Sequence, residues 1–528
     1  MPTYFSRLLL AVLLLVPVRL LAAEAEIGAP SDAAAFVSAD YAGQAALLEH
    51  WAASPSEARA GLVLAIAEGR LAADSQKRPY IETGGQFTPP ADPQDAPRKL
   101  RLNNRLRGLA ETALASQRLL AGTPEQRLEA ARQLQNSARP EQLPWLQQQA
   151  AQAPEGALRS ALNLALANLQ LTANDAQVRL QAVRLLGETG EPMAQARLQN
   201  LLAGDTETDT AVRTAAQTSL AQIKRQLMIG EWLGQAFSGL SLGSILLLAA
   251  LGLAITFGLL GVINMAHGEM LMLGAYATYC VQLLCQRYAP GWLEWYPLLA
   301  LPVAFGVTAA VGMALERTII RHLYGRPLET LLATWGISLM LIQAVRVLFG
   351  AQNVEVANPA WLSGGLQVLP NLVLPWNRLV IIGFASAVVL LTWLLLNKTR
   401  LGLNVRAVTQ NRNMAACCGV PTGRVDMLAF GLGSGIAGLG GVALSQVGNV
   451  GPDLGQGYII DSFLVVVLGG VGQLAGSVWA AAGLGVANKL LEPQIGAVLG
   501  KILILALVIL FIQKRPQGLF ALKGRVID

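Results

Sequence analysis

The chain changes character near its middle. From Glu24 to Arg225, apolar residues recur at helical spacing among many Ala, Gln, Arg and Glu residues, whereas from Trp232 to Gln513 Gly residues interrupt long apolar stretches. Overall, 53% of the residues are hydrophobic and only 14% are charged, against roughly 25% charged in soluble domains. The pattern predicts an all-α protein in which a helical soluble domain, residues 24–228, precedes a polytopic membrane domain, residues 229–528.

The first 23 residues have the organisation of a secretory signal peptide. Arg7 supplies a positive charge, Leu8 to Val16 form a short apolar core, and small residues at Ala22 and Ala23 suit cleavage. The apolar run is short for a membrane span. An uncleaved anchor, which would add one transmembrane helix, is the alternative.

The soluble half contains a recurring helical pattern: an acidic residue, then an apolar residue and Arg at the third and fourth following positions, then a small or apolar residue three further on. The acidic residue can cap a helix while the apolar positions face a neighbouring helix. We therefore expect a HEAT-like domain of short helical hairpins, with an extended loop from Thr83 to Pro97. The matches are Glu155/Leu158/Arg159/Leu162, Asp175/Val178/Arg179/Ala182 and Asp209/Val212/Arg213/Ala216, and Gly187, Gly190 and Pro192 are expected to separate two helices.

The second half contains about nine apolar stretches of a length that suits membrane spans. The stretch from Ile459 to Leu490 is ambiguous, because it fits one long span, two short ones or a pair of helices broken around Gly469, Gly470 and Gly472. The predicted spans are Phe237–Leu259, Gly268–Cys285, Tyr296–Leu315, Leu328–Phe349, Leu379–Asn397, Val425–Val447, Ile459–Gly472, Gly476–Leu490 and Val498–Ile512.

Lys and Arg residues gather in three segments beside these spans, which by the positive-inside rule should be cytoplasmic. The opposite loops carry Trp292, Trp295, Trp361 and Trp376 and suit the outer interface. This orientation places the N-terminal domain outside and the C-terminus in the cytoplasm. The basic segments hold Arg317, Arg321 and Arg326, then Lys398, Arg400, Arg406, Arg412 and Arg424, and finally Lys514, Arg515, Lys523 and Arg525.

The most distinctive polar positions are Asn264, His267 and Glu269, within the segment 258–270 (GLLGVINMAHGEM) between two apolar spans. Polar groups at such depth are costly and tend to face a cavity, a partner or a solute. The alternative is that His267 and Glu269 pair with each other or cap a helix at a short turn. Residues 470–477 (GVGQLAGS) resemble 261–268 (GVINMAHG), with Gln473 and Asn264 each at the fourth position of its segment. The resemblance suggests an internal repeat.

Other conspicuous residues have simpler interpretations. Small residues at helical spacing, Gly431, Ser434, Gly435, Gly438 and Gly441, favour close helix packing over pore lining. Arg346, Asp461, Glu492 and Lys501 are expected to snorkel or to form ion pairs near span ends. Cys417 and Cys418 are adjacent but have no nearby His or second Cys pair, so we expect neither a metal site nor any cofactor.

Three separated motifs, in order, resemble the LivH-type permeases of branched-chain amino acid ABC importers. They are GVINMAHGEM at 261–270, LGLNVRAVTQNRNM at 401–414 and VLGGVG at 467–472. The segments 415–420 (AACCGV) and 511–520 (FIQKRPQGLF), together with the long N-terminal extension, are similar to the urea-transport branch of that family. Ordinary LivH proteins begin near the first span.

The resemblance implies an inner-membrane permease subunit that transports urea, with branched-chain amino acids or amides as the alternative solutes. It implies a LivM-like second permease, two cytoplasmic ATP-binding subunits and a periplasmic solute-binding protein as partners. The chain itself has no Gly-x-x-x-x-Gly-Lys-Ser/Thr loop for ATP phosphates. The residues expected to couple to the ATPase are Arg400, Asn404, Arg406, Gln410, Asn411 and Arg412, unless this is an ordinary solvated loop.

Two other classes of function remain as alternatives. A passive urea channel would need no ATPase. A sensor or membrane enzyme would need catalytic residues, but the chain has no kinase motif, no His-Glu-x-x-His zinc site and no nucleophile elbow. The formal charge of +6 is explained by loops beside spans, so we expect no nucleic-acid partner.

Overall fold

The computed structural model describes residues 30–83, 86–89, 97–154, 156–203 and 207–520. The chain divides into two compact units, Met1–Leu227 (unit 1) and Met228–Asp528 (unit 2). The predicted signal peptide, Glu155 of the first helical pattern, and Lys523 and Arg525 of the basic tail lie outside the described residues.

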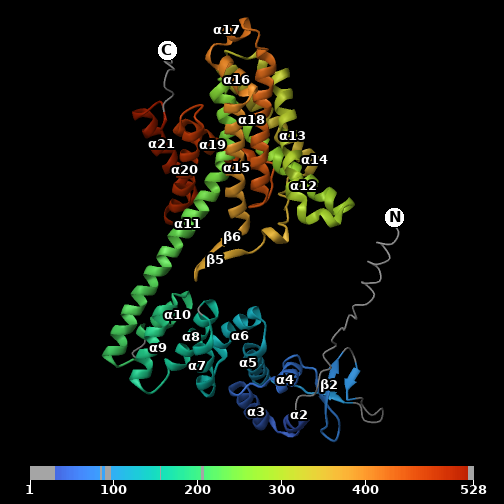
Figure 1. The fold of residues 1–528 in the computed structure, drawn as a ribbon, viewed down its shortest axis with the longest axis vertical. Coiled ribbons are helices and arrows are strands. Elements are labelled where there is room, and N and C mark those ends of the chain that lie inside the picture. The colour runs from blue at the N-terminus through green and yellow to red at the C-terminus, as the bar shows by residue number, and fades with distance from the viewer. Residues whose placement is uncertain (1–29, 84–85, 90–96, 155, 204–206, 521–528) are drawn as a thin grey trace, which may run out of the picture. The chain divides into compact units, whose positions relative to one another are not determined.

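Unit 1 is built mainly from short helices that follow one another along the chain (Figure 1). A small antiparallel sheet with strand order β3-β2-β1-β4 accompanies the first helices. The elements are α2 (Pro30–Ser38), α3 (Tyr41–Ala53), α4 (Ala60–Ala67), β1 (Leu71–Ala73), β2 (Pro79–Thr83), β3 (Gln86–Thr88), β4 (Arg98–Lys99), α5 (Asn104–Ala121), α6 (Pro124–Ser137), α7 (Leu143–Gln152), α8 (Ala157–Gln170), α9 (Ala176–Thr189), α10 (Pro192–Ala203) and the first part of α11 (Thr210–Leu260).

The sheet is a feature that the sequence analysis missed. The proline-rich stretch expected to be a loop contains β3, in which Thr88 pairs with Ile81 of β2. Ile81 is buried in the first hydrophobic core of unit 1. Pairing with β2, which is anchored in the core through Ile81, therefore holds part of the proline-rich stretch in a sheet. The prolines of the stretch exclude a helix.

The helical pattern of unit 1 is confirmed at its two described copies. The Oδ1 atom of Asp175 accepts a hydrogen bond from the Gln177 backbone N–H at the start of α9, and Asp209 Oδ1 accepts from the Ala211 N–H, at 2.8 Å, at the start of α11. Gly190 ends α9 in a left-handed conformation. The prediction was wrong for Gly187, which lies inside α9, where an added Cβ would come within 2.6 Å of Ser219 Oγ on α11.

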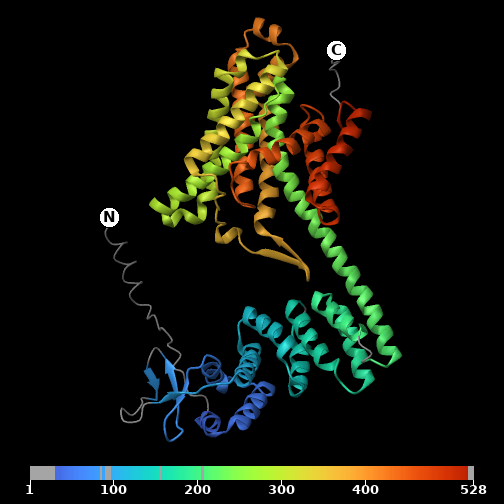
Figure 2. The ribbon, with the colours of Figure 1, turned by 180° about the vertical axis from the view of Figure 1, so that it is seen from behind.

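Unit 2 is a bundle of longer helices with one two-stranded hairpin (Figures 1 and 2). Its elements are the rest of α11, α12 (His267–Tyr288), α13 (Tyr296–Thr318), α14 (Pro327–Phe349), β5 (Gly365–Leu369), β6 (Leu372–Pro375), α15 (Trp376–Lys398), α16 (Arg400–Gln410), α17 (Arg412–Cys417), α18 (Thr422–Ser445), α19 (Leu454–Gly469), α20 (Leu474–Ile495) and α21 (Ala497–Lys514), with short 3₁₀ turns that include η3 (Pro290–Trp295) and η4 (Ile320–His322).

Each of the nine predicted spans coincides with one of these helices. Within the described part of the chain, seven helices are long and apolar enough to cross a membrane, which makes the protein polytopic. The other two are α12 and the 16-residue apolar helix α19. The ambiguous stretch from Ile459 to Leu490 forms two helices, because Gly470 and Gly472 take left-handed conformations with φ of 100° and 80° that interrupt the helix.

The glycine-rich face of α18 packs closely against its neighbours, as predicted. A Cβ built on Gly438 would lie 2.2 Å from Thr308 Oγ1 of α13, and one on Gly441 would lie 2.1 Å from the Leu271 carbonyl of α12. Both positions therefore require glycine. The predicted pairing of charges near span ends is also confirmed, in Arg346–Asp453 at 2.7 Å, Lys489–Glu492 at 2.6 Å and Lys501–Asp461 at 3.2 Å.

The two ends of unit 2 differ in chemistry. Helices α16 and α17 lie at one end and the β5–β6 hairpin at the other (Figure 1). The guanidinium carbon of Arg412 lies 4.7 Å from the ring centroid of Tyr324. This contact joins the loop after α13 to the α16–α17 end. At the hairpin end the Trp361 indole donates to the Glu294 carbonyl at 2.7 Å and stacks on Trp295. Two of the basic segments thus share one end, and tryptophans gather at the other.

Candidate functional site

A non-helical segment, residues 261–266, interrupts the bundle between α11 and α12. Gly261 turns the chain with a φ of 70°. The freed backbone groups are satisfied by side chains: the Met265 N–H donates to Thr334 Oγ1 of α14 at 3.1 Å, and the Ala266 N–H donates to Asn264 Oδ1 at 3.0 Å. Irregular backbone inside a membrane domain is tolerated where protein or a water-filled cavity surrounds it.

His267 begins α12 and is completely buried. Its Nε2 lies 3.0 Å from the backbone carbonyl of Ala249, so Nε2 carries the hydrogen and Nδ1 is left as an acceptor. The ring fits because residue 252 is glycine, where an added Cβ would come within 2.8 Å of His267 Cε1 and 2.3 Å of the Gly433 carbonyl on α18. His267 is therefore tightly packed between α11 and α18.

Glu269 lies two residues further along α12 and is also buried. One carboxyl oxygen, Oε1, accepts a hydrogen bond from Ser338 Oγ of α14 at 2.9 Å. No cation pairs with this carboxyl group among the described residues. His267 and Glu269 thus bond to different helices and not to each other.

The site is distinguished by polar atoms that have no partner. Within the described chain, Asn264 Nδ2, His267 Nδ1 and Glu269 Oε2 are buried without a hydrogen bond. They comprise one donor and two sites that can accept. Since an unpaired buried polar atom costs about 1–3 kcal/mol, such a group of atoms suits a solute that offers both donors and acceptors.

Gln473, the fourth predicted pathway residue, lies at the N-terminal boundary of α20. Its segment lies beside the end of α11, because a Cβ built on Gly258 would come within 2.7 Å of the Gly472 backbone. The two similar segments, 261–268 and 470–477, both begin with a glycine that turns the chain, and a helix starts within each of them. No hydrogen bond joins the Gln473 side chain to Asn264, His267 or Glu269 in the part of the chain that the structure describes.

Two hollows lie in unit 2, and the first borders this region. One, of about 260 Å³, has Asn264 as its polar side chain among apolar residues of α11, α14 and α19. The other, of about 240 Å³, was missed by the sequence analysis because its polar residues come from separate helices and loops. It is lined by Ser238, Ser241, Arg378, Asn449, Tyr458 and Lys489 together with apolar residues.

The predicted coupling loop forms a helical hairpin, α16–α17, with one buried face. Gly402, Val405, Val408 and Ala415 are buried, and Thr399 caps α16. Two exposed apolar side chains that the sequence analysis did not single out, Leu403 and Met414, are each 60% exposed on the other side. The hairpin thus combines an anchored face with an exposed, partly apolar one.

The six residues predicted on this hairpin have different environments. Arg400, Gln410 and Asn411 are exposed, and Asn404 is half-buried. Asn411 caps α17 by accepting from the Met414 N–H at 2.9 Å, and Arg406 donates to the Leu396 carbonyl of α15. Arg412 is also exposed, but its Nη2 donates to the buried Asp426 Oδ2 of α18.

Two buried acidic side chains and the half-buried Tyr324 form a cluster next to that arginine. Asp426 is completely buried. The Tyr324 hydroxyl donates to Glu316 Oε1 at 3.5 Å. Burial and the nearby Asp426 and Glu316 carboxyl groups raise the pKa of the Tyr324 phenol above its usual value, so it stays a donor at neutral pH. The Glu316 carboxyl is 2% exposed.

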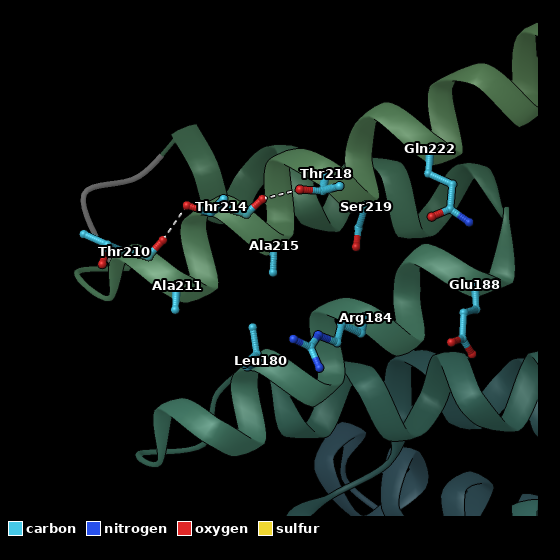
Figure 3. Close-up of a pocket in the computed structure, with 10 residues that line it drawn as sticks. All are labelled: Leu180, Arg184, Glu188, Thr210, Ala211, Thr214, Ala215, Thr218, Ser219 and Gln222. Atoms are coloured by element: carbon cyan, nitrogen blue, oxygen red, sulfur yellow. Dashed lines mark hydrogen bonds between the residues drawn. The ribbon is translucent and has the colours of Figure 1, made fainter.

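Unit 1 contains an open groove of about 760 Å³ between α9 and α11 (Figure 3). One wall carries Leu180, Arg184 and Glu188 at four-residue spacing, and the other carries small and hydroxyl residues. Two of these hydroxyls are bonded to their own helix, Thr214 to the Thr210 carbonyl at 2.8 Å and Thr218 to the Thr214 carbonyl at 2.7 Å. The groove can contact a polar surface of mixed charge.

Comparisons with known proteins agree on one family. The family model described as "Branched-chain amino acid transport system / permease component" matches residues 235–512. Among curated proteins, the chain is similar to the high-affinity branched-chain amino acid transport system permease protein LivH of Escherichia coli K12, with 29% identity over 297 residues that cover 54% of this chain and 95% of LivH.

Two further relatives are named for the same solute and for a different one, respectively. BraD of Pseudomonas aeruginosa, also a branched-chain amino acid permease protein, is 29% identical over 55% of this chain and 96% of BraD. The autoinducer 2 import system permease protein LsrD of Yersinia enterocolitica is 29% identical over 34% of this chain and 53% of LsrD. No solved structure matches the chain significantly.

Proposed function

This chain belongs to the branched-chain amino acid ABC transporter permease family, and from that premise we propose that it is the inner-membrane permease subunit of an importer for urea. Residues 229–528 are the permease domain and residues 24–228 a periplasmic domain with a HEAT-like organisation, exported by a signal peptide at residues 1–23. The LivH match covers 95% of that protein but only 54% of this chain, so the extra unit separates this chain from it.

The proposed orientation rests on charge. Arg321 and Arg326 follow α13, Lys398 ends α15 and Arg400 begins α16, at the end of unit 2 that carries the α16–α17 hairpin. Positive loops remain cytoplasmic. The α16–α17 end therefore faces the cytoplasm, and the tryptophan-bearing end faces the periplasm.

The observation that carries urea as the solute is the group of unpaired atoms on Asn264, His267 and Glu269, with no cation pairing to Glu269 among the described residues. Urea is neutral and offers both N–H donors and a carbonyl acceptor, so it can replace its water hydrogen bonds at such a site. A zwitterionic amino acid needs a charge complement for each end. Branched-chain amino acids, the cargo in the names of LivH and BraD, are the second candidate.

The hairpin α16–α17 is the proposed contact with an ATP-binding subunit. Its outward side combines Leu403 and Met414 with Arg400 and Gln410, and a docking surface commonly places apolar residues inside a polar rim. The other proposed partners are a LivM-like second permease, a second ATP-binding subunit and a periplasmic solute-binding protein.

Uptake of labelled urea, with labelled leucine in parallel, tests the proposal. Cells that lack this gene are complemented with it, with and without a functional partner ATPase. We expect complementation to restore urea uptake only with the functional ATPase. Restored leucine uptake alone would assign the chain to amino acids, and urea flux without the ATPase would identify a passive channel.

A single substitution tests the docking surface. We expect Leu403→Asp to reduce co-purification of the ATP-binding subunits at least about ten-fold, because a buried interface anchor is worth about 2 kcal/mol or more. Val368→Asp, at a half-exposed apolar position on β5 at the other end of unit 2, is the control and should retain them. Equal retention by both variants would contradict the assignment.

A further inference from the structure

Arg412, whose side chain is 43% exposed, pairs with the buried Asp426 in a cluster that joins three separate elements. It belongs to α17, its Nη2 donates to Asp426 Oδ2 of α18, and its guanidinium lies over the ring of Tyr324, with 4.7 Å between Cζ and the ring centroid. Tyr324 belongs to the loop between α13 and α14. One side chain of the cytoplasmic hairpin thus contacts two further parts of the bundle.

The Asp426 carboxyl group of this cluster depends on Arg412. Asp426 is completely buried and Glu316 is 2% exposed, and within the described residues Asp426 Oδ1 and Glu316 Oε2 have no hydrogen-bond partner. Arg317 and Arg321 lie within electrostatic range of Glu316, but neither forms an ion pair with it in the structure. Removing the cation from such a pair is strongly unfavourable, because it leaves a buried charge uncompensated.

The cluster is also connected to the candidate site. Asp426 and Gly433 lie on the same rigid helix, α18, seven residues or about 10 Å apart at 1.5 Å per residue. The Gly433 carbonyl is one of the atoms that an added Cβ on Gly252 would meet, beside the His267 ring. Displacing the start of α18 therefore displaces the packing around His267.

We propose that Arg412 is a positioning residue that fixes the α16–α17 hairpin to α18 and to the α13–α14 loop, so that movement of the hairpin on the ATPase is transmitted to the segment holding Asn264, His267 and Glu269. This deepens the proposed function and rests on it. Because the buried Asp426 carboxyl group requires the cation, the hairpin has an engaged position and a costly released one, and motion passes into α18 instead of being absorbed at the hairpin.

The test uses the full complex with its ATP-binding subunits in lipid nanodiscs or vesicles. Three quantities are measured: subunit co-purification, ATP hydrolysis, and solute transported per ATP, with urea or leucine according to which the wild type carries. We expect Arg412→Ala to assemble and hydrolyse ATP but to transport at least about ten-fold less solute per ATP, a usual size for the coupling between two sites. Arg412→Lys should recover the ratio only in part, since an ammonium lacks the planar guanidinium that stacks on Tyr324.

The matched control is Arg424→Ala. Arg424 is exposed, lies on α18 two residues before Asp426, and forms no ion pair in the described chain. It should keep the wild-type ratio. If Arg412→Ala does not accumulate, the double variant Arg412→Ala/Asp426→Asn leaves no charge buried alone and should show the same loss of transport per ATP.

Hydrogen exchange gives a readout that does not depend on the solute. In the full chain, Arg412→Ala should speed exchange of the α16–α17 amides at least about ten-fold relative to Arg424→Ala, as local opening becomes easier. Wild-type transport per ATP in the double variant, or unchanged exchange in Arg412→Ala, would overturn the inference. Absence of ATP-dependent uptake by the wild type would instead overturn the proposed function. The exchange result would then still test whether Arg412 fixes the hairpin to α18.

Discussion

Two arginine–carboxylate pairs, one in each unit, are built differently. In unit 1 the Arg179 guanidinium donates to both oxygens of Glu207, at 2.7 and 3.0 Å, and the Asp209 N–H donates to Glu207 Oε1 as well. In unit 2 Arg412 reaches one oxygen of Asp426, and the other has no partner. The first pair is closed, which means that both carboxylate oxygens have hydrogen-bond partners. The second leaves one buried carboxyl oxygen without a partner.

The same contrast holds across the two units. Nine buried side-chain polar atoms lack a hydrogen bond among the described residues, and eight of them belong to unit 2. Buried polar atoms in proteins nearly always have partners, so a local excess marks a strained or functional region. Among the described residues, the buried polar atoms of unit 1 are therefore more completely paired than those of unit 2.

The largest expected effect tests whether unit 2 is tightly packed around these atoms. Gly252→Ala should lower the free energy of unfolding by about 3 kcal/mol, at the upper end for an overpacked core, because its Cβ would meet the Gly433 carbonyl and the His267 ring. Thermal unfolding in detergent measures the change. Gly306→Ala on α13, where nothing lies within 4 Å, is the control and should be close to neutral. If Gly252→Ala is equally neutral, the site is loose and its missing partners have no functional meaning.

A smaller effect tests the closed pair of unit 1. Arg179→Ala should speed hydrogen exchange of the α9 to α11 amides by about ten-fold, since it leaves the buried Glu207 carboxylate without its cation. Arg184→Ala, on the same helix at an exposed position in the groove, should leave exchange unchanged. Similar exchange in the two variants would show that the Arg179–Glu207 pair is not a structural link.

The smallest effect is a pH dependence in unit 1. Hydrogen bonding to Arg179 holds the pKa of Glu207 below its usual value, despite burial. A carboxyl group with a lowered pKa in the folded state contributes stability above its unfolded pKa of about 4.3 and loses it as the pH falls through the folded value. Exchange protection of α9 to α11, corrected for intrinsic rates, should therefore decline below about pH 4.3 in the wild type. The Arg179→Ala variant should lack this component, and a parallel decline in it would refute the explanation.

Much of the fold could be predicted from hydropathy and periodicity. Each predicted span coincides with a helix, and Asp175 and Asp209 cap helices as the repeated pattern indicates. The small sheet of unit 1 could not be predicted, because its strands are two to five residues long and depend on pairing with one another. Gly187 was read as a helix break because glycine has low helix propensity, but close contact with Ser219 keeps it inside α9.

The candidate site could be located from the sequence but not assembled from it. Asn264, His267 and Glu269 stand out as polar residues between apolar spans, yet Ala249 and Ser338, which bond to His267 and Glu269, lie on other helices. Thr334, which accepts from the Met265 N–H beside Asn264, also lies on another helix. Arg412 illustrates the same limit. The sequence assigns it to a basic loop, and only the packing of α17 against α18 brings it to Asp426.

The central claim is that the unpaired polar atoms at the break before α12 serve the transported solute. The most direct test is uptake of labelled urea by cells expressing Glu269→Gln, with membrane protein levels matched to the wild type. Glutamine keeps the oxygen that accepts from Ser338 but replaces an acceptor with an N–H donor. We predict at least about ten-fold lower uptake, the cost of one buried polar atom left without its hydrogen bond, with normal uptake by Glu329→Gln at an exposed position on α14. Wild-type uptake by Glu269→Gln would contradict the account and make Glu269 a purely structural residue.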